Sequence, residues 1–218
     1  MQAVQSMQAT NRPNQRNVWR MACAAILLCI AAAIAAPAQT FTTLADFPFQ
    51  IGSDGGGPGL IRGTDGDFYG ITSYGGVTNS VCSVGSCGTI FKVTPTGTLT
   101  ILHAFCSTTP CADGWFPSWL IRGGDGNFCG TTAFGGANHP STCSAGCGTM
   151  FKITRTGTFT TLYKFCALAG CADGGTPGSF VQAFAGVFGD FYGSNLYGGA
   201  FGYGTIQSDA ARAAHCIA

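Results

Sequence analysis

The sequence contains no glutamate and has little charge of either sign. Only 9% of its 218 residues are charged, and all nine acidic residues are aspartates. Beyond Ala38, seven lysine and arginine residues stand against nine aspartates, a net charge near −2. This balance excludes the clustered positive surface that nucleic-acid binding requires, so we expect no nucleic-acid partner. Glycine is abundant, with 34 residues, and it weakens helices and supports tight turns. The composition therefore predicts short strands joined by turns.

The sequence has a single long apolar run, and this run lies near the N-terminus. Arg12, Arg16 and Arg20 precede the uncharged stretch 21–36, and Ala36-Pro37-Ala38 supplies the small residues that a signal peptidase reads. The run of roughly 16 residues is shorter than the ~20 that span a bilayer, which favours a signal peptide over a transmembrane anchor. We predict that residues 1–38 are a cleaved signal, that the protein is secreted or at the cell surface, and that the mature chain has no membrane span.

The rest of the chain repeats itself with a shift of sixty residues. LIRGTDGDFYGITSYGG at 60–76 matches LIRGGDGNFCGTTAFGG at 120–136, and CGTIFKVTPTGTLTILHAFC at 87–106 matches CGTMFKITRTGTFTTLYKFC at 147–166. A third copy begins at 189–199 and reaches GYGTI at 202–206. We therefore predict repeat one at 60–106, repeat two at 120–166, a partial repeat three at 180–206, and a β-repeat domain spanning 39–206. FTTLADF at 41–47 predicts a leading strand, and 207–218 is a tail outside the repeat.

Each repeat divides into four short β segments. In the second copy, Asp125-Gly126 marks a hairpin between the first two, and Arg155-Thr156-Gly157 joins the last two. A four-stranded antiparallel meander repeated at about this period is typical of a propeller blade. A β-solenoid would need shorter coils, and a sandwich would not repeat so closely. We predict an all-β fold of propeller-like, four-stranded antiparallel blades, about two and a half repeats forming an incomplete, open propeller.

One motif recurs at fixed offsets over nearly the whole chain beyond residue 38. It reads DG-x-F/Y-Y/C-G-x-T, then GG, then GT-x-F-K-x-T-x-x-G-T. The pattern resembles the GloVer tandem repeat of bacterial proteins described as having a choice of surface anchor. The resemblance implies an exported or surface-attached protein with a propeller fold, and it implies no established activity and no catalytic residues. The chain has fewer repeats than this family and lacks a C-terminal anchor segment, so we expect a truncated or frame-shifted copy.

Ten cysteines follow residue 38, and eight of them form close pairs. The pairs are Cys82/Cys87, Cys106/Cys111, Cys143/Cys147 and Cys166/Cys171. In an exported chain such pairs predict local disulfides, although spacing alone does not prove their connectivity. The alternative is zinc, whose sites usually join C-x2–4-C pairs, often with histidine; we favour disulfides and expect no metal or other cofactor. Cys129 takes the place of Tyr69 and Tyr192, which predicts a buried free thiol, and Cys216 lies in the tail.

The cysteine pairs lie in two kinds of loop. Cys82/Cys87 and its repeat lie between the second and third segments, and Cys106/Cys111 and its repeat lie between the fourth segment and the next blade. In an up-and-down meander these connections emerge at one end of the blade, and the short turns emerge at the other. Function tends to lie on loops that a rigid scaffold holds. The long-loop face is therefore predicted either to bind an extracellular glycan or protein, or only to rigidify loops with little core beneath them.

Motifs for catalysis are lacking. No GxSxG, HExxH or phosphate-binding loop occurs. Five of the nine aspartates precede glycine, which is typical of turns rather than of acid–base chemistry. His103 aligns with Tyr163, so we expect a histidine on a strand surface. Other aromatic residues recur in register and are expected to form the core between blades: Phe68, Tyr69, Phe91, Phe128, Phe151, Phe191 and Tyr192.

The leading functional hypothesis is a non-enzymatic, exported binding or surface-interaction module. Its rivals are a purely structural surface repeat, a fragment of a larger propeller and, least favoured, a glycan-active enzyme. A glycosidase needs two facing carboxylates, and most aspartates here lie in turns. Because a propeller ring usually needs four to eight blades, exposed faces and strand edges also predict self-association.

Overall fold

A computed structural model of the chain describes residues 19, 41–47, 60–78, 80–82, 86–108, 110–136, 140–183 and 190–209. Contacts divide the chain into residues 1–42 and 43–218. Apart from Trp19, which is exposed, the predicted signal peptide 1–38 lies outside the described residues, as does Cys216. None of the described helical segments is long and apolar enough to cross a membrane.

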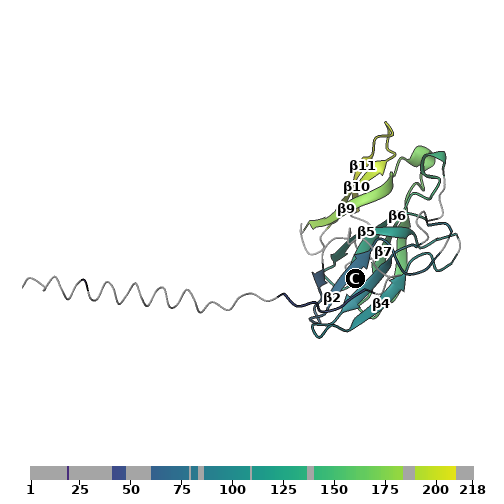
Figure 1. The fold of residues 1–218 in the computed structure, drawn as a ribbon. Coiled ribbons are helices and arrows are strands. Elements are labelled where there is room, and N and C mark those ends of the chain that lie inside the picture. The colour runs from purple at the N-terminus through teal and green to yellow at the C-terminus, as the bar shows by residue number, and fades with distance from the viewer. Residues whose placement is uncertain are drawn as a thin grey trace, which may run out of the picture. The chain divides into compact units, whose positions relative to one another are not determined.

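Three antiparallel sheets follow one another along residues 43–218 (Figure 1). The first blade contains β1 (Ile61–Arg62), β2 (Phe68–Thr72), β3 (Thr89–Val93) and β4 (Leu99–Ala104). The second blade contains β5 (Trp115–Arg122), β6 (Phe128–Phe134), β7 (Thr149–Ile153) and β8 (Phe159–Lys164). The third blade contains β9 (Gly175–Ala183), β10 (Asp190–Tyr197) and β11 (Thr205–Asp209). In each blade the strands pair in chain order, so the predicted meander of propeller-like blades is confirmed.

Hydrogen bonds from side chains fix the tight turns between strands. The Asp125 carboxylate accepts the Asn127 backbone N–H at 2.9 Å, and the Thr154 hydroxyl accepts the N–H of Thr158 at 3.0 Å. Asp65 and Asp67 repeat the first arrangement at 3.3 Å. These local bonds satisfy the backbone where the chain reverses, which is the usual role of aspartate and threonine in turns. Asp65 and Asp125, two of the five aspartates that precede glycine, therefore act in turns, as predicted, and Asp54 lies outside the described residues.

The hydrophobic core lies between successive blades. Tyr69 of the first blade packs on Phe128 of the second with ring centroids 4.2 Å apart, and both side chains are fully buried. A second cluster joins Met150 and Phe165 of the second blade to Phe180 and Phe191 of the third. Central strands β2, β3, β6 and β7 are buried on both faces, whereas the outer strands β4 and β8 are half-buried. Each blade thus buries its faces against its neighbours.

The glycine of the repeated F-Y/C-G motif has no side chain, and this leaves room for the aromatic ring of the residue opposite it on the neighbouring strand. A Cβ atom at Gly130 would overlap the Phe151 ring, and a Cβ atom at Gly70 would overlap Phe91 in the same way. Gly130 pairs with Phe151 across β6 and β7, and Gly70 pairs with Phe91 across β2 and β3. The large ring therefore lies over the small residue opposite, which keeps the centre of each sheet densely packed.

The segment 41–47, predicted to be a leading strand, is not a strand in the structure. Residues 43–47 nevertheless lie where the fourth strand of a preceding blade would lie. The Leu44 carbonyl lies against Gly97, as that of Leu102 in β4 lies against Gly157. Phe47 contacts Phe91 with ring centroids 4.8 Å apart. The segment has the packing of a fourth strand, but no described strand pairs with it, and strand structure requires such a partner.

The third blade extends beyond the predicted end of the repeat at residue 206. Strand β11 continues to Asp209, so the tail predicted for 207–218 begins inside a strand. Gly193 pairs with Gln207 as Gly130 pairs with Phe151, which keeps the register of the earlier repeats. Backbone hydrogen bonds to β10 hold the strand although its side chains no longer match the repeat.

The third blade leaves apolar side chains exposed that earlier blades bury. Ile206 is 87% exposed, whereas Ile90 and Met150 at the same repeat position are 0% and 4% exposed. Tyr192 is 39% exposed, whereas Tyr69 is fully buried. No further sheet covers this face within the described residues 190–209. The predicted exposure of the last blade is therefore present.

We expect this face to drive self-association, because exposed apolar patches and unpaired strand edges favour contact between copies. Purified mature protein should sediment faster than a monomer, with a concentration-dependent sedimentation coefficient. Ile206→Asp should shift the equilibrium toward monomer, and Thr96→Asp, in an exposed turn, should not. A monodisperse wild-type monomer at all concentrations would contradict this expectation.

Candidate functional site

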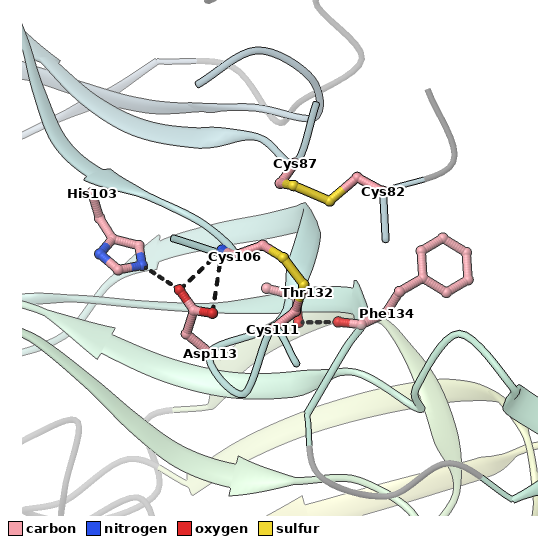
Figure 2. Close-up of a disulfide and its surroundings, with 8 residues drawn as sticks. All are labelled: Cys82, Cys87, His103, Cys106, Cys111, Asp113, Thr132 and Phe134. Atoms are coloured by element: carbon pink, nitrogen blue, oxygen red, sulfur yellow. Dashed lines mark hydrogen bonds and ion pairs between the residues drawn. A yellow bond between two sulfur atoms is a disulfide. The ribbon is translucent and has the colours of Figure 1, made fainter. Parts of the chain in front are cut away.

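The cross-linked loops gather at one end of the blades, as the sequence predicts. The structure bonds Cys82 to Cys87, Cys106 to Cys111, Cys143 to Cys147 and Cys166 to Cys171. Figure 2 shows the two first-repeat disulfides close together, one from each kind of loop. We call this end, formed by residues 75–88, 105–114, 135–148 and 165–174, the loop end. It presents the long connections, whereas the described connections at the other end are tight turns.

Four cysteines in the loops that follow β4 and β8 have a left-handed backbone conformation, which is unusual for a residue other than glycine. Cys106 and Cys111 have φ values of 57° and 58°, and Cys166 and Cys171 have 61° and 55°. This left-handed conformation costs a residue other than glycine about 1–2 kcal/mol. Such a cost persists only where the surrounding structure determines the conformation. The loop therefore has one defined shape, which both repeats adopt.

The aspartate of the CADG motif holds this loop shape. Asp113 accepts the Cys106 backbone N–H at 3.1 Å and contacts His103 Nε2 at 3.0 Å (Figure 2). In the next repeat, Asp173 accepts the Ala167 N–H at 2.8 Å and the hydroxyl hydrogen of Tyr163. Because tyrosine replaces histidine without loss of the contact, this carboxylate has a structural role.

His103 is not on the strand surface, so that prediction is wrong. Its side chain is only 17% exposed, and its ring stacks on Phe159 of the second blade at 3.9 Å. Sequence alignment located His103 on a strand but did not show that the next blade covers that face. The ring is held between Asp113 and an aromatic neighbour.

Cys129 is buried, as its alignment with Tyr69 predicts, but it is not a free thiol. Its side chain is 1% exposed and its sulfur is disulfide-bonded. Comparison of the repeats predicts that the Cys129 side chain is buried, but it does not show whether the sulfur of another cysteine lies within bonding distance. The prediction of a free thiol is therefore wrong.

An aromatic cluster lies at the loop end between the first and second blades. The Phe116 ring contacts Tyr74 at 5.2 Å and Phe134 at 6.0 Å, and Trp115 contacts Phe134 at 4.6 Å. Tyr74, Phe116 and Phe134 are half-buried, so part of each ring faces solvent. Trp115 is buried, and its indole N–H has no acceptor among the described residues, so ring packing holds it.

This cluster departs from the repeat. The positions of Trp115 and Phe116 are occupied by Gly175 and Thr176 in the next copy. Phe116 and Thr176 share a positive φ, of 58° and 51°, so the backbone shape belongs to the repeat but the aromatic rings do not. The repeat pattern does not predict these residues, because it points to the aromatics that recur. These residues could have been found as a departure from the repeat, because a tryptophan and a phenylalanine follow CADG directly in only one of the two copies.

A cavity of about 410 Å³ lies between the second and third blades, with Tyr163 and Gln207 in its wall. Between the first and second blades, Phe151 and Phe159 fill the equivalent space, and Phe159 stacks on His103. Gln207 stands where the repeat has Phe151, and residues 190–209 include no fourth strand. The cavity is thus explained as a gap in blade packing rather than as a ligand pocket.

Ion pairs and hydrogen bonds of the carboxylates at both ends of the blades hold the turns and loops in place. The Lys152 ammonium contacts the Asp125 carboxylate at 2.9 Å, and Lys92 contacts Asp67 at 3.0 Å. Burial opposes ionisation of Asp125, but hydrogen bonds from Lys152 and Asn127 outweigh it and lower the pKa of this carboxyl. The pKa of Tyr69 is raised, first by burial and then by its hydrogen bond to the Asp65 carboxylate. These carboxylates therefore have structural partners.

Comparison with known proteins agrees with the repeat pattern. The sequence model of the Gloeobacter/Verrucomicrobia repeat matches residues 32–209 and confirms the resemblance found from the DG, GG and GT-x-F-K motifs. No protein of curated function matches the sequence.

One similar solved structure is a crystal structure described as that of a gluconolactonase. It matches with 12% identity and a TM-score of 0.39, over 68% of this chain and 47% of the other. The chain thus spans about half the length of that structure, and a likeness at this TM-score carries no argument about activity.

The Tyr163–Asp173 contact predicts a pH-dependent contribution to stability. Burial opposes ionisation of Asp173, but hydrogen bonds from Tyr163 and from two backbone N–H groups lower its pKa below 3.8. A lowered pKa means that the contribution is complete above this ordinary value and is lost as the pH falls through the lower, folded-state value.

Tyr163→Phe should therefore lower the free energy of unfolding by about 1–2 kcal/mol at neutral pH, since it removes a hydrogen bond to a charged group. Urea unfolding should show this deficit shrinking as the pH falls through the folded-state pKa of Asp173, below which the carboxyl is protonated in both states. Tyr192→Phe, at an exposed tyrosine, is the control. A deficit that does not change with pH would refute the assignment.

Proposed function

The chain belongs to the Gloeobacter/Verrucomicrobia repeat family, and from that premise we propose that it is an exported, non-enzymatic binding module. The four disulfides between neighbouring cysteines suit an oxidising compartment outside the cytoplasm. The arginines and the apolar run of residues 1–38 supply the features of a secretory signal, and a mature N-terminus near Gln39 follows from the Ala36-Pro37-Ala38 site.

The observation that carries the proposal is the aromatic cluster at the loop end. Tyr74, Phe116 and Phe134 present half-buried rings on a surface whose loops are cross-linked by disulfides. Function tends to lie on loops held by a rigid scaffold, and rigid aromatic side chains lose little entropy on binding. The repeat does not require a ring at Phe116, where the next copy has Thr176, and Phe116 is only half-buried, so a ligand is a better explanation for this ring than the fold is.

The ligand class that this surface fits best is an extracellular glycan. Each aromatic ring offers an apolar face that suits the C–H face of a sugar, and the Tyr74 hydroxyl adds a polar group that suits the sugar hydroxyls. Charged residues are scarce over the whole chain, so attraction by unlike charges has little part in recognition. A protein ligand is the alternative, and it would use the same rings.

An enzymatic function is less well supported, because the aspartates at both ends have structural partners. Each of five carboxylates contacts at least one nearby side chain: Asp65 with Tyr69, Asp67 with Lys92, Asp113 with His103, Asp125 with Lys152 and Asn127, and Asp173 with Tyr163. A glycosidase needs one carboxyl group to act as an acid and another to act as a base or nucleophile. Side chains committed to turns and loops are poorly placed for either role.

Binding of secreted protein to an array of extracellular glycans tests the proposal. Phe116→Ala should weaken binding about two- to tenfold, because one aromatic contact is worth about 0.5–1.5 kcal/mol. Thr96→Ala, in a turn at the opposite end, should leave affinity unchanged, and both variants should melt cooperatively. If no glycan binds, or if Thr96→Ala weakens binding as much as Phe116→Ala does, the glycan-binding role of the loop end is wrong.

A further inference from the structure

Four cysteine sulfurs of the second repeat lie close enough together to share one metal ion. The Sγ atoms of Cys143, Cys147, Cys166 and Cys171 all lie within 4.8 Å of one another. Cys143 and Cys147 come from the loop between β6 and β7, and Cys166 and Cys171 come from the loop between β8 and β9. Two loops that are separate in the sequence therefore bring their sulfurs to one point.

The dimensions and spacing of this cluster suit zinc. A tetrahedral zinc ion with Zn–S bonds of about 2.3 Å holds its four sulfurs about 3.8 Å apart. The four sulfurs lie within 4.8 Å of one another, and reduction of the two disulfides lets each bonded pair separate to that distance. Structural zinc sites usually take two cysteine pairs with two to four intervening residues, and these pairs have three and four. Sequence spacing alone did not favour zinc, because it did not show that the two loops meet.

The surroundings provide a protected and defined site. Cys147 is 1% exposed, Cys143 and Cys166 are each 9% exposed, and Cys171 is half-buried. Backbone hydrogen bonds fix both loops, from Thr176 N–H to the Cys147 carbonyl and from Cys166 N–H to the Gly174 carbonyl. A site that is already shaped in this way requires little rearrangement to take up an ion.

The first repeat contains a partial version of the same arrangement. The sulfurs of Cys82, Cys106 and Cys111 lie within 4.8 Å of one another, and Cys87 is bonded to Cys82 (Figure 2). A sixty-residue shift maps this group onto the second-repeat cluster, apart from one residue at Cys82. The convergence of two loops is thus a property of the repeat.

We propose that the second-repeat cluster binds one Zn²⁺ ion as a tetrathiolate when its two disulfides are reduced. Each disulfide accepts two electrons and two protons from one equivalent of a dithiol, which becomes a disulfide, so the cluster gains four thiols. Binding of Zn²⁺ then releases the four thiol protons. A disulfide links residues within one loop, whereas the ion links the β6–β7 loop to the β8–β9 loop. The oxidised and reduced chains therefore have different cross-links, and this inference is independent of glycan binding.

The test uses the full chain, prepared with a dithiol and transferred to a phosphine reductant without the dithiol. Zinc content is measured by elemental analysis, and cobalt(II) replaces zinc to give the absorption bands of a tetrahedral thiolate site. Cys143→Ser should lower the zinc content by one ion per chain. Cys129→Ser, at a buried cysteine outside the cluster, should not lower it.

Protection from alkylation gives a second measurement without any substitution. Zinc should slow alkylation of Cys143, Cys147, Cys166 and Cys171 in the reduced wild-type chain, as peptide mapping would show. Oxidised protein should bind no zinc at these positions. The proposal fails if reduced, folded protein binds no zinc, if Cys143→Ser retains the full amount, or if oxidised protein binds as much as reduced protein.

Discussion

The structure depends on the burial of each sheet face against the next sheet. No single blade has enough core of its own, because its central strands carry apolar side chains on both faces. Tyr69 on Phe128 and Phe105 on Phe151 are the main contacts of this kind between the first two blades. Stability in such repeat architectures comes largely from interfaces between neighbours. The face of the third blade that carries Ile206 is exposed for the same reason, since no described sheet covers it.

This constraint also determines where sequence can vary. Faces of the sheets are buried against neighbouring blades, so we expect substitutions to be tolerated better at the ends of the blades than on these faces. At the turn end, short hydrogen-bonded turns leave little freedom. At the loop end, disulfides and the Asp113 and Asp173 carboxylates hold long loops in one shape. Trp115 and Phe116 could therefore appear in one copy without disturbing the scaffold that carries them.

Much of the fold could be predicted because the repeat shows which residues share a position. The strands of the second blade, the pairing of neighbouring cysteines and the common end of both kinds of loop all follow from that alignment. Contacts between blades do not follow from it. The cover over His103 and the aromatic cluster at Phe116 depend on how one sheet lies against the next. Strand β11 continues past residue 206 because backbone hydrogen bonds to β10 do not require the side chains of the repeat.

The central claim is that packing between blades, rather than strand propensity within them, stabilises the fold. Tyr69 and Tyr192 occupy the same position in two repeats, but only Tyr69 is covered by a following blade. Urea unfolding of two alanine variants is the most direct test. Tyr69→Ala should lower the free energy of unfolding by about 3–5 kcal/mol, the usual cost of removing a buried aromatic side chain. Tyr192→Ala should lower it by about 1 kcal/mol or less. Equal losses for the two variants would contradict the account.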